Sequence, residues 1–162
     1  MDRAVSAPDL AAAIARLAAM PAFVASAIAA FPRALATRPA TSDFALVEHA
    51  CHLRDLDREA FIVRARRMIG EAVPVLEPFQ GDVVARERDY LSQDAVRASR
   101  DFAAAREALV RFLSALGNAQ LEREGMFAGE RITVRQLIAM IEEHDAEHRA
   151  QIDRLLLQLD AA

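Results

Sequence analysis

Apolar residues recur every three or four positions along four long stretches of this chain, which is the spacing of one face of an α-helix. The first stretch starts near Pro8 and Asp9, where proline suits the first helical turn, and it ends before Pro32. Pro21 is expected to kink or divide this helix because proline removes a backbone hydrogen bond. The apolar positions of the stretch are Leu10, Ile14, Leu17, Phe23, Val24 and Ile28.

The second stretch is expected to begin at Ser42 or Asp43, both favourable N-cap residues, and to end at Gly70. The segment that follows, residues 71–91, is the least regular part of the chain because it contains Pro74, Pro78 and Gly81. We therefore predict a long loop between the second and third helices. A long loop in a compact domain often has a function.

The third stretch runs from about Ser92 to Leu116, and the fourth extends to about Leu159. A loop with Gly125 and Gly129 separates them, and Thr133 opens the fourth with the pattern of a capping box, Thr133-Val134-Arg135-Gln136. No segment has a convincing strand pattern. The sequence therefore predicts an all-α four-helix bundle, as a single domain over residues 1–162.

Composition supports this class, because alanine, leucine, arginine and glutamate are strong helix formers. The net charge of −4 is spread without a basic stripe, so we expect no nucleic-acid partner. The single cysteine, Cys51, excludes an intramolecular disulfide and fits a reducing compartment. We see no secretory signal, and the longest apolar run, Met20 to Phe31, is too short to span a bilayer. We expect a cytoplasmic protein with no membrane partner.

Two of the four histidines, His144 and His148, are four residues apart on the fourth helix and so share a face. Both fall close to the apolar stripe that includes Ile141 and Ile152. An unpaired buried polar group costs about 1–3 kcal/mol, and a metal ion would satisfy both imidazoles at once. The alternative is a pair of ordinary, partly buried histidines that bond to neighbouring carboxylates such as Glu143 or Glu147.

On the second helix, His49 and His52 are three residues apart, and one of them would complete a set of three imidazoles. Three nitrogen ligands with open positions suit a catalytic rather than a structural metal. Asp55, one turn after His52, could orient its imidazole or instead be a surface charge paired with Arg54 or Arg58.

Two further polar residues of this helix could join a metal site. Cys51 is more simply explained as a small buried residue, because free cysteine is among the most buried residue types. For Glu48 we expect a solvated position on the helix surface.

These motifs resemble the DinB/YfiT-like superfamily of metal-binding four-helix bundles. In that family an aromatic residue, usually tryptophan, precedes an H-L-x-D motif on helix two, as Phe44 precedes His52-Leu53-Arg54-Asp55 here. The run from His144 to Ile152 is similar to the H-x-x-x-H motif of its last helix. The resemblance implies one divalent metal bound by His52, His144 and His148, with no ligand role for His49. Phenylalanine in place of tryptophan affects packing but no ligand.

The resemblance also implies a class of reaction. Some members resemble transferases in which a low-molecular-weight thiol binds the metal and attacks an electrophile, and others look like hydrolases or thiol-dependent isomerases. The metal is expected to be zinc, with nickel or iron as alternatives, because imidazole suits all three. By position alone, Arg64, Arg67 and the 71–91 loop are candidates for contacts with a small-molecule substrate.

Two other readings remain open. The metal could be non-catalytic and only join helix two to helix four, which a fourth protein ligand would indicate. The bundle could also be an interaction module without metal, because helix one is more apolar than one bundle face requires, at Phe23, Val24, Ile28 and Phe31. Members of the family often form dimers, so a homodimer is compatible with every reading.

Overall fold

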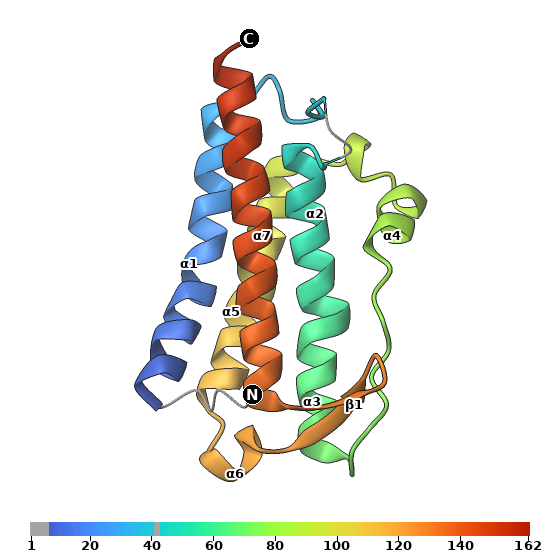
Figure 1. Cartoon of the computed structure of the whole chain (residues 1–162). Helices are drawn as coiled ribbons and strands as arrows, with labels where there is room; N and C mark the ends of the chain where they lie inside the picture. Colours follow the sequence, from blue (N-terminus) through green and yellow to red (C-terminus); the bar gives the residue numbers. More distant parts are fainter. Residues whose placement is uncertain (1–6, 41–42) are drawn as a thin grey trace.

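The computed structural model describes residues 7–40 and 43–162 and forms an elongated bundle of four long helical rods (Figure 1). The first rod is α1 (Ala7–Ala30), the third is α5 (Ala95–Ser114) and the last is α7 (Val134–Asp160). The second rod consists of α2 (Leu46–Leu56), a π-helical turn (Asp57–Phe61) and α3 (Ile62–Gly70), which follow one another without a break. The predicted all-α four-helix bundle is thus confirmed.

The start of the second rod differs from the prediction. Helix α2 begins at Leu46 with Ala45 as its N-cap residue, rather than at Asp43, and Ser42 lies outside the described residues. The backbone N–H of Ala45 donates a hydrogen bond to the Glu48 carboxylate at 3.0 Å. This backbone group at the start of the helix is thus satisfied, although Ala45 has no polar side chain to act as a cap. The predicted end at Gly70 is confirmed.

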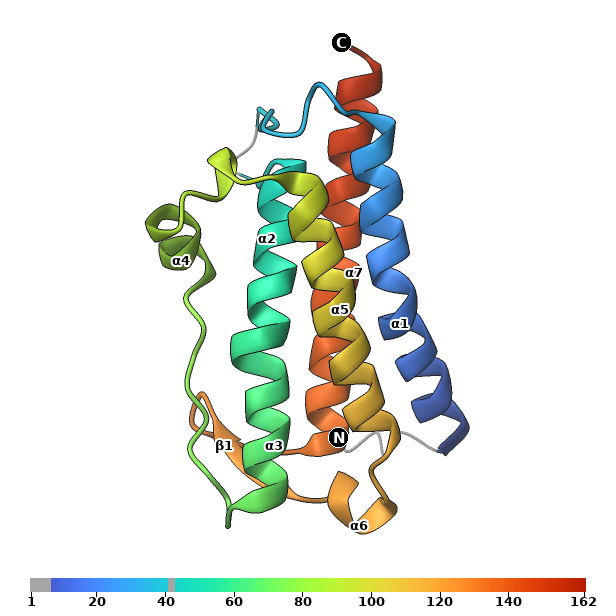
Figure 2. The ribbon, with the colours of Figure 1, turned by 180° about the vertical axis from the view of Figure 1, so that it is seen from behind.

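Helix α1 is continuous through Pro21, so this residue does not divide it. By length and composition alone, the segment Asp9–Ala30 is long and apolar enough to cross a membrane, with a mean hydropathy of 1.7. It is longer than the run from Met20 to Phe31, which the sequence analysis judged too short to do so. In the structure, α1 packs along α5 and α7, and a third of the segment is buried (Figure 2).

The segment between α3 and α5 is anchored to the bundle rather than free. It contains two short helices, α4 (Gly81–Glu87) and a 3₁₀ turn (Tyr90–Ser92), after an extended stretch that runs along the outside of α3 (Figure 2). Arg64 and Arg67 donate hydrogen bonds to the carbonyls of Glu77 and Val75, at 2.9 and 2.8 Å. Both arginines therefore hold this loop against the helix.

A β-hairpin occupies the region that the sequence pattern assigned to a loop. Strands β1 (Glu124–Phe127) and β2 (Glu130–Thr133) pair antiparallel around a two-residue turn. Ala128 and Gly129 both have positive φ, 51° and 82°, as a type I′ turn requires. Alanine rarely adopts a positive φ, so the sequence pair Ala128-Gly129 does not predict a hairpin turn. The Thr133 capping box of α7 is confirmed, with hydrogen bonds of 2.8 and 3.2 Å.

The buried interior has two apolar halves with polar residues between them along the rods. One half is built around Leu17, Leu109 and Ile141, and the other around Val24, Phe102 and Ile152. On α5 the residue between the two halves is Arg106, and on α7 the residues between them are His144, Asp145 and His148. The functional candidates of the fold lie in this middle layer.

Candidate metal centre

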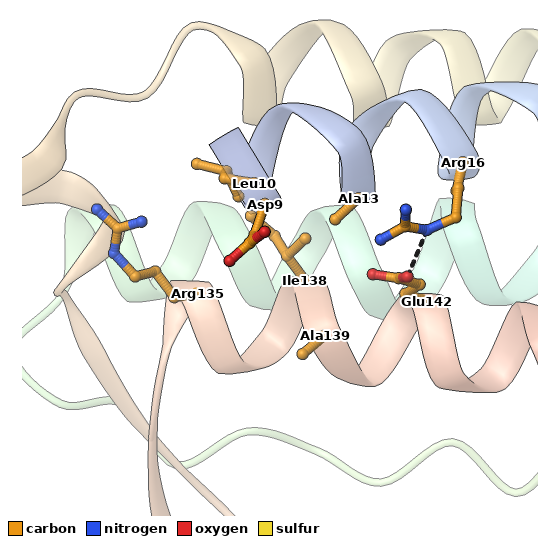
Figure 3. A pocket seen from close by; sticks show the side chains of 8 residues that line it. All are labelled: Asp9, Leu10, Ala13, Arg16, Arg135, Ile138, Ala139 and Glu142. Carbon is orange, nitrogen blue, oxygen red and sulfur yellow. Dashed lines mark hydrogen bonds and ion pairs between the residues drawn. The ribbon is translucent and has the colours of Figure 1, made fainter. Parts of the chain in front are cut away.

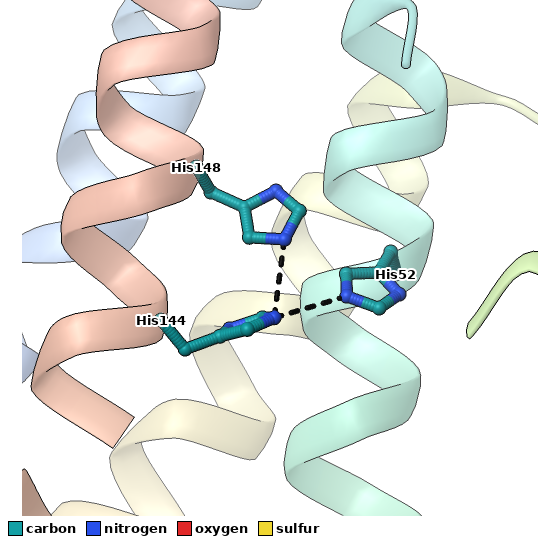
Figure 4. Close-up of side chains that lie close together, drawn as sticks. All are labelled: His52, His144 and His148. Atoms are coloured by element: carbon teal, nitrogen blue, oxygen red, sulfur yellow. Dashed lines mark hydrogen bonds between the residues drawn. The ribbon is translucent and has the colours of Figure 1, made fainter. Parts of the chain in front are cut away.

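Three imidazoles from two rods converge in the middle of the bundle. His52 projects from α2, and His144 and His148 project from adjacent turns of α7, with their Nε2 atoms turned toward one another (Figure 4). Nε2 of His144 lies 3.3 Å from Nε2 of His52 and 3.1 Å from Nε2 of His148. The structure therefore brings together the three histidines that the family resemblance implies as ligands.

Hydrogen bonding among the imidazoles cannot satisfy this arrangement. A neutral imidazole has one donor and one acceptor nitrogen, so His144 Nε2 can serve only one of the two nitrogens that face it. Nδ1 of His52, Nδ1 of His144 and Nε2 of His49 are also buried without a hydrogen-bond partner among the described residues, and a cation held by the converging Nε2 atoms would not contact them. Two nitrogens bound to one zinc ion at tetrahedral angles lie roughly 3.3 Å apart, and two of the three pairs of Nε2 atoms here are separated by 3.3 and 3.1 Å. The three residues fit a divalent cation.

Electrostatics keep these imidazoles neutral. Burial lowers the pKa of His52 to about 4, against the opposing influence of Asp55 and Asp82. Burial, His52 and Arg106 lower the pKa of His144 to about 3, and burial together with the neighbouring imidazoles moves the pKa of His148 still further down. The neutral imidazole is the form that binds a metal, so the site stays ready for a cation well below neutral pH.

Comparison with known proteins agrees with this architecture. The sequence model of the DinB superfamily matches residues 32–152 of this chain. The chain belongs to the DinB superfamily. The solved structure of YfiT from Bacillus subtilis superposes with a TM-score of 0.89 over 99% of this chain and 93% of that chain, at 18% sequence identity. It is described as a probable metal-dependent hydrolase with an unusual four-helix bundle topology. No curated protein sequence matches the chain.

The fourth histidine of this DinB-superfamily chain also lies in the cluster. His49 is fully buried, and its Nδ1 lies 2.8 Å from Nδ1 of His148. It stands outside the group of three converging ligand atoms, as expected for a neighbour of the site. All four histidines of the chain therefore gather at one place.

Asp55 does not orient His52. Its carboxylate accepts hydrogen bonds from Arg54 at 2.7 Å, from Arg88 at 2.9 Å and from the Tyr90 hydroxyl at 2.6 Å. The alternative, a charge paired with Arg54, is therefore correct, but the pair is buried rather than on the surface. Through Arg88 and Tyr90, Asp55 ties the loop before α5 to the second rod.

The two remaining polar residues of helix α2 are both buried, one as expected and one not. Cys51 faces the core, where burial raises the pKa of its thiol to about 11, so it is unsuited to act as a nucleophile. The expected solvated position of Glu48 was wrong. Its carboxylate is buried and forms two hydrogen bonds with Arg38, at 2.7 and 2.8 Å.

A pocket of about 210 Å³ opens over the histidines. Its lining includes the imidazoles of His52 and His148, the Phe44 ring and, toward its polar side, Asp43, Asp82 and Gln151. The 71–91 loop contributes Asp82 to the lining, and at the preceding Gly81 a Cβ atom would lie 2.7 Å from Cε1 of His52. The predicted functional loop thus reaches the site through α4, while Arg64 and Arg67 do not line this pocket.

Another buried polar cluster was missed by the sequence analysis. Arg106 of α5 is 1% exposed and donates hydrogen bonds to both carboxylate oxygens of Asp57, at 2.7 and 3.1 Å, and of Asp145, at 2.5 and 3.0 Å. Its Nη1 also reaches the Leu17 carbonyl at 3.0 Å. Arg106 is one of many arginines in the chain, and its neighbours in sequence give no sign of burial.

A separate groove of about 370 Å³ lies between α1 and α7 and shares no residue with the histidine pocket. Figure 3 shows that two of its charged groups, Arg16 and Glu142, face each other at one end of it, with a hydrogen bond of 2.6 Å. These two charges are therefore used to join α1 to α7.

Proposed function

We propose that this protein is a divalent-metal-dependent enzyme in which His52, His144 and His148 hold the ion and a small nucleophile attacks a small electrophilic substrate. The convergence of three neutral Nε2 atoms beside an open pocket is the observation that carries the proposal. The group of converging atoms contains no carboxylate or thiolate among residues 7–40 and 43–162. An ion with three nitrogen ligands keeps a position for substrate, which favours catalysis over a purely structural role.

An ion bound here would lower the pKa of a thiol or of water and polarise a substrate oxygen. The surrounding residues contribute the walls of the pocket, with Phe44 packed 5.4 Å from the His52 ring centre. Asp82 lines the pocket, and its carboxylate is our candidate for the group that accepts a proton from the nucleophile. Because the Cys51 thiol faces the core, a thiol nucleophile would be a free low-molecular-weight thiol.

The experiment is a rate measurement with zinc-loaded wild type beside His144→Ala. A panel of low-molecular-weight thiols is mixed with an alkyl halide or an epoxide, and thiol loss is followed. Ester and amide hydrolysis without thiol is followed in parallel. We expect the wild type to accelerate thiol consumption and the variant to fall to the uncatalysed rate. Hydrolysis without thiol would shift the proposal to a hydrolase, and no acceleration in either assay would contradict it.

We expect zinc as the ion, with nickel or iron as alternatives. Imidazole nitrogens suit each of these metals, so geometry alone does not choose among them. Loading the metal-free protein separately with each ion and comparing thiol consumption identifies the active form. Equal activity with and without added metal would contradict the proposed chemistry.

We also propose that two copies associate through α1. The exposed side of this helix consists almost entirely of small residues, Ala11, Ala12, Ala15, Ala18, Ala19, Ala22, Ala25, Ser26, Ala29 and Ala30. Such a surface allows two helices to approach closely and carries little charge. Light scattering is expected to give twice the mass of the chain, and Ala18→Glu to give the single mass. A wild-type monomer would contradict this association.

A further inference from the structure

His49 is the one histidine that the three-ligand site does not use, and yet it is completely buried within it. It lies on α2 one turn before His52, with its ring packed edge-on against Phe44 at 5.7 Å. Its Nδ1 is 2.8 Å from Nδ1 of His148, and the two rings meet at 87°. This contact has the distance of a hydrogen bond, so one of the two nitrogens must donate and the other accept.

The two neutral rings share a single proton along this contact. If His148 carries it on Nδ1, the Nε2 atom of His148 has a free lone pair that points to His52 and His144. If His49 carries it, His148 is protonated on Nε2 and cannot bind a cation there. The direction of this one hydrogen bond therefore decides whether His148 can serve as a ligand.

We propose that His49 is a positioning residue that accepts the Nδ1 proton of His148 and so presents Nε2 of His148 to the metal. This inference rests on the proposed metal site. Metal-binding histidines usually donate their second N–H to a carboxylate, a carbonyl or water. Here the two carboxylates of α2 are used elsewhere, since Glu48 pairs with Arg38 and Asp55 with arginines and Tyr90. A neutral imidazole takes the place of a carboxylate as the partner of His148 Nδ1.

The same geometry predicts a change of tautomer when the ion binds. Without metal, Nε2 of His148 can donate to Nε2 of His144 at 3.1 Å, which places the shared proton on His49. With metal, the lone pair of His148 Nε2 is required, so the proton moves to Nδ1 of His148 and His49 is protonated on Nε2. Selection of the tautomer by a neighbouring group is the recognised role of such a partner.

Two substitutions at the same position test the role. His49→Leu fills the space without an acceptor, and His49→Asn places an amide oxygen at the position of Nδ1. Zinc affinity is measured by competition with a chromophoric chelator. We expect the leucine variant to bind zinc 10- to 100-fold more weakly than the wild type, and the asparagine variant to remain within a few-fold of it. A purely structural residue predicts the opposite order, since leucine preserves apolar packing better than asparagine does.

Nitrogen-15 spectra of the imidazoles give a second readout that packing alone does not move. Zinc-bound wild type is expected to show His148 protonated on Nδ1, and metal-free protein to show it protonated on Nε2. Wild-type affinity in His49→Leu, or an Nε2 proton on His148 in the zinc-bound protein, would overturn the inference and leave the metal site standing. If the wild type itself binds no zinc, the proposed function and this inference both fail.

Discussion

Two polar clusters in the interior share helix α7 at consecutive residues, and they differ in whether their polar groups find partners within the chain. Asp145 belongs to the ion cluster, in which Arg106 forms hydrogen bonds with two carboxylates. His144, the preceding residue, belongs to the histidine cluster, in which its Nε2 faces two other Nε2 atoms and can form a hydrogen bond with only one of them. The ion cluster is complete in itself, whereas the histidine cluster requires something from outside the chain.

This difference separates a structural cluster from a site. Buried charges remain in a fold when they are paired and hydrogen-bonded, because an isolated buried charge is far too costly. Arg106 meets that condition, joining α5 to the π turn at Asp57 and to α7 at Asp145. The imidazoles are kept neutral by burial and retain lone pairs that point to one place. The same helix therefore carries a stabilising contact on one side and a binding site on the other.

The largest effect is expected from breaking the ion cluster. Replacement of Arg106 by methionine leaves Asp57 and Asp145 buried without a counter-charge. We expect the free energy of unfolding, measured by urea denaturation of metal-free protein, to fall by about 3–5 kcal/mol. The matched change in the other cluster, His144→Leu, is expected to cost much less, because it removes a neutral ring and leaves no buried charge without a counter-charge. Equal losses would contradict the comparison.

Zinc should stabilise the wild type through the histidine cluster. A ligand that binds only the folded state at 100 times its Kd adds about 2.7 kcal/mol to the free energy of unfolding. We expect a shift of this size in urea denaturation for the wild type and none for His52→Ala. An unchanged curve for the wild type after verified loading would show that the ion does not join α2 to α7.

The two clusters should respond to pH with opposite signs. The folded-state pKa values of His52 and His144, about 4 and 3, lie below the unfolded value of about 6.5. In that range the unfolded chain binds more protons, so stability falls as pH falls, by about 1.4 kcal/mol per pH unit for each such histidine. Burial raises the pKa of Asp57 to about 6, so its contribution is present at low pH and is lost as pH rises.

The four histidines, whose pKa values are all lowered, outweigh the carboxylates, so metal-free wild type should lose stability from pH 6.5 toward pH 4. Denaturation in urea at several pH values measures this slope, and His144→Leu should reduce it. A wild-type stability that is independent of pH in this interval would contradict the neutral state of the histidine cluster.

A smaller effect is expected from the loop that borders the site. In Gly81→Ala the new Cβ would lie 2.7 Å from the His52 ring and displace it, whereas nothing lies within 4 Å of a Cβ at Gly70. We expect Gly81→Ala to weaken zinc binding several-fold and Gly70→Ala to leave it unchanged, by chelator competition. Equal affinities in the two variants would mean that α4 does not fix His52.

The sequence predicted the parts of this molecule that depend on local spacing. Helical periodicity located the four rods, the Thr133 capping box located the start of α7, and the i,i+4 spacing placed His144 beside His148. His52 was predicted as the third ligand from its resemblance to a family motif, and the structure places it beside His144 and His148.

What the sequence missed depends on contacts between distant segments. Arg106 is buried because Asp57 and Asp145 arrive from two other rods, and Glu48 because Arg38 reaches it from the preceding connection. The role of Asp55 changed for the same reason, since Tyr90 lies on a distant loop. Pairs of residues that are distant in the sequence leave no local sequence pattern from which the contact could be predicted.

The most direct test of the account is the metal content of untagged protein, wild type beside His52→Ala and His148→Ala, by elemental analysis after incubation with zinc and dialysis. The account predicts about one equivalent of metal in the wild type and none in either variant. A wild type that retains no metal, or variants that retain as much as the wild type, would contradict the three-histidine centre.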